Sequence, residues 1–159
     1  MNIDILSLLN NSLMAALASA GFAMLFNVPR RALPLSAMCG AVGVCSRMLF
    51  LHYGEMHVAM ATLGAAILVA ALAELLSSRM NMPPSLFSVA GVIPMVPGGL
   101  MFRSVVYWLN IAASDSGPFD EALFGAAWSL TGTAFLVLSA LALGIAAPNL
   151  IFYRRRPEA

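Results

Sequence analysis

Long apolar stretches alternate with short polar breaks along almost the whole of this 159-residue chain. Five of the stretches are long enough to cross the hydrocarbon core of a bilayer, which takes about 20 residues of helix. They cover residues 5–26, 33–51, 58–76, 85–109 and 123–147. The pattern predicts an all-α integral membrane protein with about five transmembrane helices, forming a single polytopic membrane domain over residues 1–159.

The composition fits a chain that lies in lipid. Hydrophobic residues make up 61% of the sequence and charged residues 9%, whereas soluble domains carry about 25% charged residues. The length leaves no room for a folded aqueous domain beside five spans, so we expect any nucleotide-driven motor to reside elsewhere. We predict no cofactor and no contact with nucleic acid.

Charge separates cleanly when five crossings are counted. One side carries the topology determinants Arg30, Arg31, Arg79, Arg154, Arg155 and Arg156, the last three within a basic tail at 153–159, and the other carries Asp4, Glu55, Asp115, Asp120 and Glu121. Because cytoplasmic loops are enriched in Lys and Arg, the N-terminus is predicted outside and the C-terminus in the cytoplasm. Four crossings would split the basic loops between both sides, and this arrangement ranks second.

The fourth stretch contains an unusual run of helix-breaking residues. Pro94 and Pro97 lack amide hydrogens and clash with carbonyls one turn back, and Gly98 and Gly99 follow at once. We therefore predict that the fourth helix is broken from Pro94 to Gly99. Broken helices in transporters often form substrate sites, but a proline kink packed against a neighbouring helix is an equally good interpretation.

Three charged residues lie inside apolar stretches. Arg47 and Arg103 can hold a substrate carboxylate through paired hydrogen bonds, or they can serve as interfacial anchors whose side chains reach the outer surface. Glu74 is a candidate for proton coupling, since burial raises the pKa of a carboxyl group. Its alternative role is to reach water or to pair with Arg79.

The sequence offers no catalytic constellation. His52 and His57 are five residues apart and do not share a helix face, and Cys39 and Cys45 are too widely spaced for a metal site. There is no Ser-His-Asp set, no phosphate-binding glycine loop before a Lys and no Cys-x-x-Cys pair. We therefore expect no enzyme, no catalytic residue and no metal.

Three segments carry a resemblance to a known family: residues 21–33 (GFAMLFNVPRRAL), 92–98 (VIPMVPG) and 153–157 (YRRRP). Together they resemble the small subunit of the ThrE-type threonine/serine exporter family, and within it the small subunit of the bacterial split succinate exporter. Val96, Gly99 and Arg103 depart from the succinate-type pattern, and the paired glycines with the nearby arginine look more like the general family. Both substrate classes therefore stay open.

The resemblance implies a two-component secondary exporter in the bacterial inner membrane, in which this multi-pass chain forms a hetero-oligomer with a larger subunit of the same family. The implied substrates are succinate or related dicarboxylates, or threonine and serine. In this hypothesis Arg47 and Arg103 recognise the carboxylate at the broken helix, and Glu74 carries a proton. The alternative is a non-transporting membrane scaffold that stabilises the larger subunit.

The predicted orientation can be tested with one engineered cysteine. Ser116 lies in the polar segment between the fourth and fifth stretches, which the charge pattern places outside. In a variant that lacks Cys39 and Cys45, Ser116→Cys should react with a membrane-impermeant maleimide added to intact spheroplasts. Reaction only after the membrane is ruptured would reverse the topology.

Overall fold

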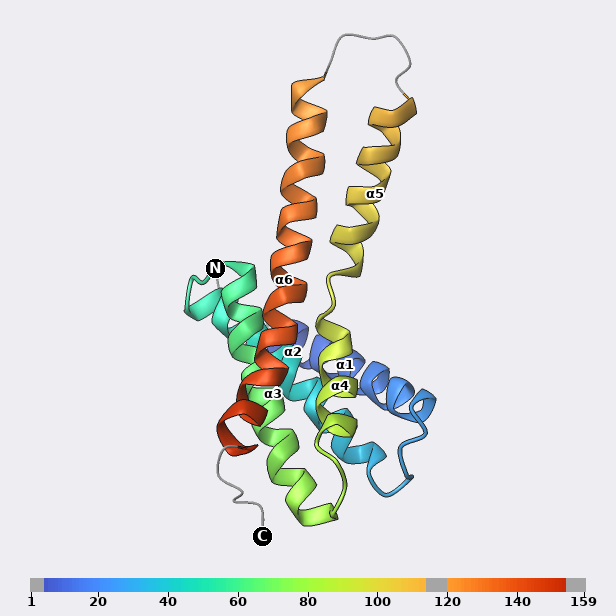
Figure 1. The fold of residues 1–159 in the computed structure, drawn as a ribbon, viewed down its shortest axis with the longest axis vertical. Coiled ribbons are helices and arrows are strands. Elements are labelled where there is room, and N and C mark those ends of the chain that lie inside the picture. The colour runs from blue at the N-terminus through green and yellow to red at the C-terminus, as the bar shows by residue number, and fades with distance from the viewer. Residues whose placement is uncertain (1–4, 114–119, 154–159) are drawn as a thin grey trace.

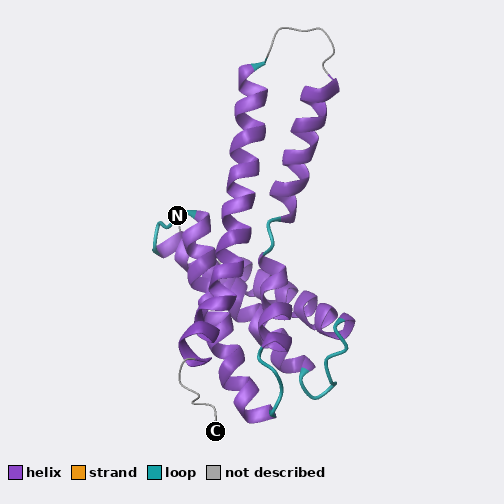
Figure 2. Cartoon of the chain, viewed as in Figure 1, coloured by secondary structure: helices purple, strands orange, loops and turns teal. Residues whose placement is uncertain are grey.

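The computed structural model confirms that the chain is all-helical and that its fourth apolar stretch is broken (Figure 2). It describes residues 5–113 and 120–153, with side chains described as far as 148. The elements are α1 (Ile5–Leu25), α2 (Leu33–Tyr53), α3 (Val58–Met80), α4 (Ser85–Val92), η1 (Ile93–Met95), α5 (Gly98–Ala113) and α6 (Glu121–Tyr153). Asp4, Asp115, Ser116 and Arg154 to Arg156 lie outside the described residues.

Four of these helices are long and apolar enough to cross a membrane by themselves, namely α1, α2, α3 and α6. A fifth span results if α4 to η1 and α5 are counted as one crossing, although the two parts are bent by 52° at the break. The chain therefore forms four to five candidate membrane spans, one of them a bent pair. This is the architecture that the apolar pattern predicts.

The helix ends follow local backbone chemistry rather than polarity. The third apolar stretch was predicted to end at residue 76, yet α3 continues through Ser77, Ser78 and Arg79 as far as Met80. It ends at Asn81, which adopts a left-handed conformation (φ 52°, ψ 41°) and donates its N–H to the Ser77 carbonyl. The α1–α2 connection contains a second such residue, Asn27 (φ 59°). Asparagine tolerates this conformation better than most residues.

The molecule has a packed part and a protruding part (Figure 1). In the packed part α4 lies against α1, α2 and α3, while α6 packs on α3. The protruding part is a hairpin of α5 and the first half of α6, which stands away from the other helices (Figure 1). Five of the 8 residues of α4 are buried, whereas Ser104 is the buried residue among the 16 of α5.

Small residues allow the helices of the packed part to approach closely. Along α3 the fully buried positions Ala61, Ala65, Ala66 and Ala73 form the face that its neighbours contact. Gly40 of α2 lies so near α1 that an added Cβ would be 2.5 Å from the Cβ of Ser19. In lipid, where helices gain no hydrophobic free energy by associating, such close contacts supply much of the packing energy.

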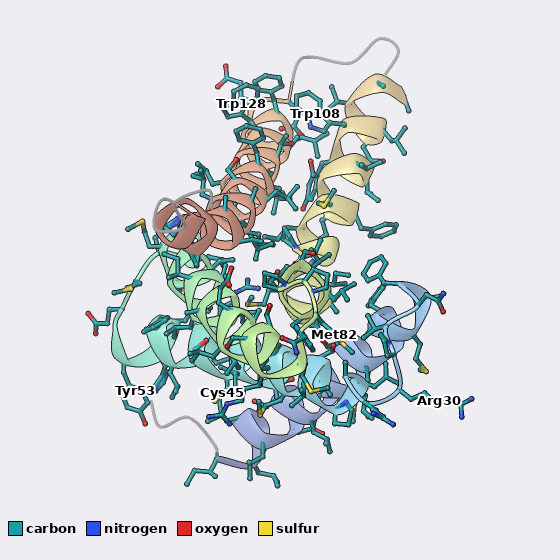
Figure 3. All side chains as sticks on the ribbon, turned by 60° about the horizontal axis from the view of Figure 1, so that its bottom comes forward. Arg30, Cys45, Tyr53, Met82, Trp108 and Trp128 are labelled. Carbon is teal, nitrogen blue, oxygen red and sulfur yellow. The ribbon has the colours of Figure 1, made fainter. Side chains whose placement is uncertain are left out.

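A cluster of polar side chains joins the two helices of the hairpin. The Thr131 hydroxyl donates to the Ala127 carbonyl (2.7 Å), so it accepts from Ser104 (2.6 Å) and from the indole N–H of Trp108 (2.9 Å). Trp108 also meets Phe124 edge to face, with ring centroids 5.6 Å apart. Figure 3 shows Trp108 and Trp128 at the same end of the hairpin. The cluster fixes α5 on α6.

Two glycines of α6 provide a matched test of the division into a packed and a protruding part. An added Cβ at Gly144 would overlap the Cβ of Ala66 in α3, whereas at Gly132 it would meet nothing within 4 Å. Gly144→Ala should destabilise the protein by about 1–3 kcal/mol, as overpacking does. Gly132→Ala should be neutral or stabilising by about 0.5–1 kcal/mol, because Gly is a poorer helix former than Ala. Unfolding by SDS in mixed micelles measures both, and equal effects would contradict the packing described.

Candidate functional site

The break between α4 and α5 is the most distinctive feature of the backbone. After the short η1 turn, Val96 is extended (φ −60°, ψ 131°), and α5 begins at Gly98. Pro97 has no N–H to offer the Ile93 carbonyl, which instead accepts from Val96 N–H at 3.0 Å. The Gly98 N–H turns back to the Val96 carbonyl at 2.8 Å. The helical hydrogen-bond pattern is thus interrupted for one full turn.

Pro94 leaves the Ala90 carbonyl without its helical donor, and a side chain from α1 replaces it. The Ser19 hydroxyl, fully buried, lies 2.8 Å from that carbonyl and 2.7 Å from the Ser36 carbonyl of α2. A hydroxyl carries a single proton, so the two carbonyls share it. Ser19 therefore links α1, α2 and α4 at the level of the break.

Arg47 satisfies the second carbonyl that the break frees. In a continuous helix the Met95 carbonyl would accept from Gly99 N–H, but the extended Val96 prevents this. Instead the Arg47 Nη1 of α2 donates to it at 2.9 Å. The Arg47 side chain is partly buried, and within the described part of the chain it forms no ion pair. A guanidinium offers five N–H donors, so most of its donors are left over.

The first residues of α5 add unsatisfied backbone donors beside this arginine. After Gly98, the next residue of α5 whose N–H donates along the chain is Met101, to the Pro97 carbonyl at 3.0 Å. The acceptors that Gly99 and Leu100 would use, at Met95 and Val96, are already engaged by Arg47 and Gly98. An added Cβ at Gly98 or Gly99 would meet nothing within 4 Å. Backbone N–H groups at an open helix start favour anionic groups.

The structure does not bring Arg103 into contact with this arrangement. Arg103 is exposed in the second turn of α5, next to Ser104, which faces α6. Among the described residues it makes no hydrogen bond and no ion pair. Of the two arginines predicted to bind a carboxylate, Arg47 alone contacts the broken helix.

Glu74 lies partly buried on α3 and forms no ion pair with Arg79 within the described residues. The continuation of α3 to Met80 explains why the two do not meet. Positions five apart point to different sides of an α-helix, whereas partners lie three or four residues apart. The carboxyl group is therefore available to other partners or to water.

Two features of the site were not predicted from sequence: Ser19 as the donor to the broken helix, and the Ser104–Thr131–Trp108 cluster. The prolines at 94 and 97 indicate that some backbone carbonyls need other donors. They do not identify which of the many serines supplies them. No group of three or more His, Cys, Asp or Glu side chains that could hold a metal ion occurs in the described ranges.

Sequence comparisons place the chain among known proteins. Residues 11–151 match the family described as "Threonine/Serine exporter, ThrE". An uncharacterized protein of Haemophilus influenzae is 36% identical over 155 residues, which cover 98% of this chain and 51% of that protein. The chain thus spans about half the length of this curated relative. No solved structure matches the chain.

Removing the Ser19 hydroxyl tests whether the break depends on a donor from α1. Ser19→Ala leaves the buried carbonyls of Ala90 and Ser36 short of a proton and should lower the free energy of unfolding by about 1–3 kcal/mol. Ser7→Ala, at an exposed position of the same helix, is the matched control and should change little. Both are measured by SDS unfolding, and equal stability of the two variants would refute the assignment.

Proposed function

Because the chain belongs to the threonine/serine exporter family, we propose that it is one component of a secondary exporter for small carboxylate-bearing metabolites. The candidates are succinate or related dicarboxylates, and threonine or serine. Family membership favours transport over enzymatic activity. The multi-pass helical architecture provides the membrane setting that such a role requires, and the bacterial inner membrane is the proposed location.

The observation that supports this role best is Arg47 beside the break. An arginine on a membrane-spanning helix costs about 3 kcal/mol or more unless it faces a partner or water. Arg47 is satisfied by one neutral carbonyl and keeps further donors in the planar geometry that binds a carboxylate bidentately. The free N–H group of Leu100, at the start of α5, complements it. We assign the carboxylate site to Arg47 and to the break of Pro94, Pro97, Gly98 and Gly99.

Arg103 and Glu74 have separate parts in this proposal. Arg103 is exposed on α5 beyond the break, where it would meet the carboxylate on the way to or from Arg47. Glu74 has no cationic partner among the described residues and is the proposed proton carrier. The proposed role of Arg47 does not depend on the roles assigned to Arg103 and Glu74.

A larger subunit of the same family is the proposed partner. The chain spans about half of its Haemophilus influenzae relative, so the relative carries a second part that this sequence does not match. The hairpin offers a broad surface for a second helical subunit. Its exposed apolar residues include Phe102 (71%), Trp128 (66%) and Phe135 (69%). In lipid, van der Waals packing against such side chains can come from a second helical subunit as well as from lipid.

One observation favours the alternative role of a non-transporting scaffold. Arg47 already has a backbone acceptor in this structure, as an arginine retained to stabilise a broken helix would. In that case the chain would hold the larger subunit in place without touching the substrate. Transport measurements on Arg47 variants separate the two roles.

The decisive experiment is efflux of preloaded labelled succinate and threonine from cells that express this chain, its larger-subunit candidate, or both. We expect efflux to require both chains. Arg47→Ala should reduce it about 10- to 100-fold, because a hydrogen bond to a charged group contributes about 1.5–3 kcal/mol.

Arg30→Ala, an exposed position in the α1–α2 connection, is the control and should retain efflux. Co-purification of the two subunits shows that each variant assembles. Normal efflux with assembled Arg47→Ala would leave the scaffold role, and efflux from this chain alone would exclude the two-component arrangement.

A further inference from the structure

We propose that the hydrogen bond from Arg47 to the Met95 carbonyl is a latch that a substrate carboxylate opens. In this inference the guanidinium exchanges a neutral backbone acceptor for the incoming carboxylate, and the released carbonyl changes the bend between α4 and α5. The inference rests on the proposed function, since it requires a carboxylate to reach Arg47. It adds a conformational consequence to binding at that residue.

The latch lies at the boundary between a fixed and a free segment. On the α4 side, Phe87, Ala90 and Met95 are fully buried, and Ser19 holds the Ala90 carbonyl. On the α5 side, Val96 is 41% exposed, and an added Cβ at Gly98 or Gly99 would meet nothing. The next described side-chain hydrogen bond along the chain is at Ser104. A hinge at residues 96–99 is therefore restrained on its packed side by Arg47.

A carboxylate can compete for Arg47 on chemical grounds. The guanidinium binds a carboxylate through two parallel N–H groups, and the carboxylate adds a full negative charge as acceptor. The Met95 carbonyl is a single neutral acceptor. No described carboxylate occupies Arg47, so an incoming one displaces no internal ion pair. Ser46, the adjacent hydroxyl, is directed to the Gly43 carbonyl of its own helix (3.0 Å) and does not compete.

The released carbonyl has a nearby donor of its own. Gly99 N–H, four residues on, is the donor that a continuous helix would provide to the Met95 carbonyl. In the present structure this N–H is not engaged by another acceptor along the chain. Pairing the two would make the hinge more helical and reduce the 52° bend. Pro97 still excludes the bond to Ile93, so a smaller kink would persist.

Straightening of α5 would carry α6 with it. The Thr131 hydroxyl, with Ser104 and Trp108 bound to it, ties α5 to the first half of α6. The second half of α6 packs on α3, where Gly144 lies against Ala66. The hairpin would therefore tilt as one unit relative to the packed part. Binding of a carboxylate at Arg47 would in this way move the hairpin surface that is proposed to contact the larger subunit.

Pulsed electron paramagnetic resonance measures this motion directly. Spin labels replace Ser85, at the start of α4, and Leu109, exposed on α5, in a chain with Cys39→Ala and Cys45→Ala. The full chain is labelled in membranes of the cells that make it, so that any partner is present. The probes are succinate and threonine, with succinamide and threoninamide as analogues that lack the carboxylates.

We expect one or both carboxylate probes to lengthen the Ser85–Leu109 distance, by up to about 3 Å, the change that complete straightening of two helices rising about 1.5 Å per residue would give. The amides should not. Arg47→Ala should show the longer distance without any probe and no further response. Arg47→Gln keeps a neutral donor for the carbonyl but has no charge, so it should keep the shorter distance and ignore the probes. Arg30→Ala, an exposed arginine in the α1–α2 connection, should respond like the parent.

The latch is refuted if Arg47→Ala leaves the unliganded distance unchanged, or if neither carboxylate moves the parent chain. The efflux assay on the same labelled chain separates this from failure of the proposed function. Efflux with an unchanging distance removes the latch and retains the exporter. A carboxylate-dependent distance without efflux retains the latch and removes the exporter.

Discussion

The need to satisfy backbone carbonyls without water shapes this molecule. Pro94 and Pro97 interrupt a membrane-spanning helix, and lipid offers no donor for the carbonyls of Ala90 and Met95 that the break leaves without a helical partner. Ser19 of α1 and Arg47 of α2 supply those donors. Each donor reaches the break from a different helix, so α1 and α2 are fixed around α4 by the same requirement. A break of this kind can persist only inside a set of helices that surrounds it.

Close packing supports this arrangement on one side of the break and ends on the other. Around α3 the contact surfaces are built from alanine and glycine, and the buried side chains leave little freedom for the helices to shift. Beyond Val96 the chain enters a hairpin that is held by the polar cluster at Thr131 and is otherwise apolar and exposed. The charged side chain of Arg47 lies where these two parts meet, which is why its chemistry bears on both.

Much of the fold could be predicted because its signals are local in the sequence. Apolar length located the spans, and the Pro-x-x-Pro-Gly-Gly run located the break, since both depend on residues close together in the chain. The end of α3 was misplaced because polar residues such as Ser77 mark the level of the membrane surface, whereas Asn81 ends the helix through its backbone. The position where the sequence becomes polar and the position where the helix ends have different physical causes and need not coincide.

The partners of the break could not be predicted, because they are distant in sequence. Ser19 and Ala90 are 71 residues apart, and Arg47 and Met95 are 48 apart. A proline in the sequence indicates that a backbone carbonyl one turn earlier needs another donor. Only the tertiary arrangement determines which side chain provides it. The same holds for the two candidate arginines, which look alike in sequence. Their difference arises because α5 bends away from the helices that enclose Arg47.

The length of α6 has a consequence for the surrounding lipid. Its apolar part, Glu121–Pro148, has 28 residues and so rises about 42 Å, whereas the hydrocarbon core of a bilayer is about 30 Å thick. Such a mismatch is accommodated by tilting the helix or by thickening the bilayer around it. Since α5 is fastened along α6, bilayer thickness would set the angle at which both helices stand. The length of the lipid acyl chains would therefore influence how far α5 and α6 are tilted in the membrane.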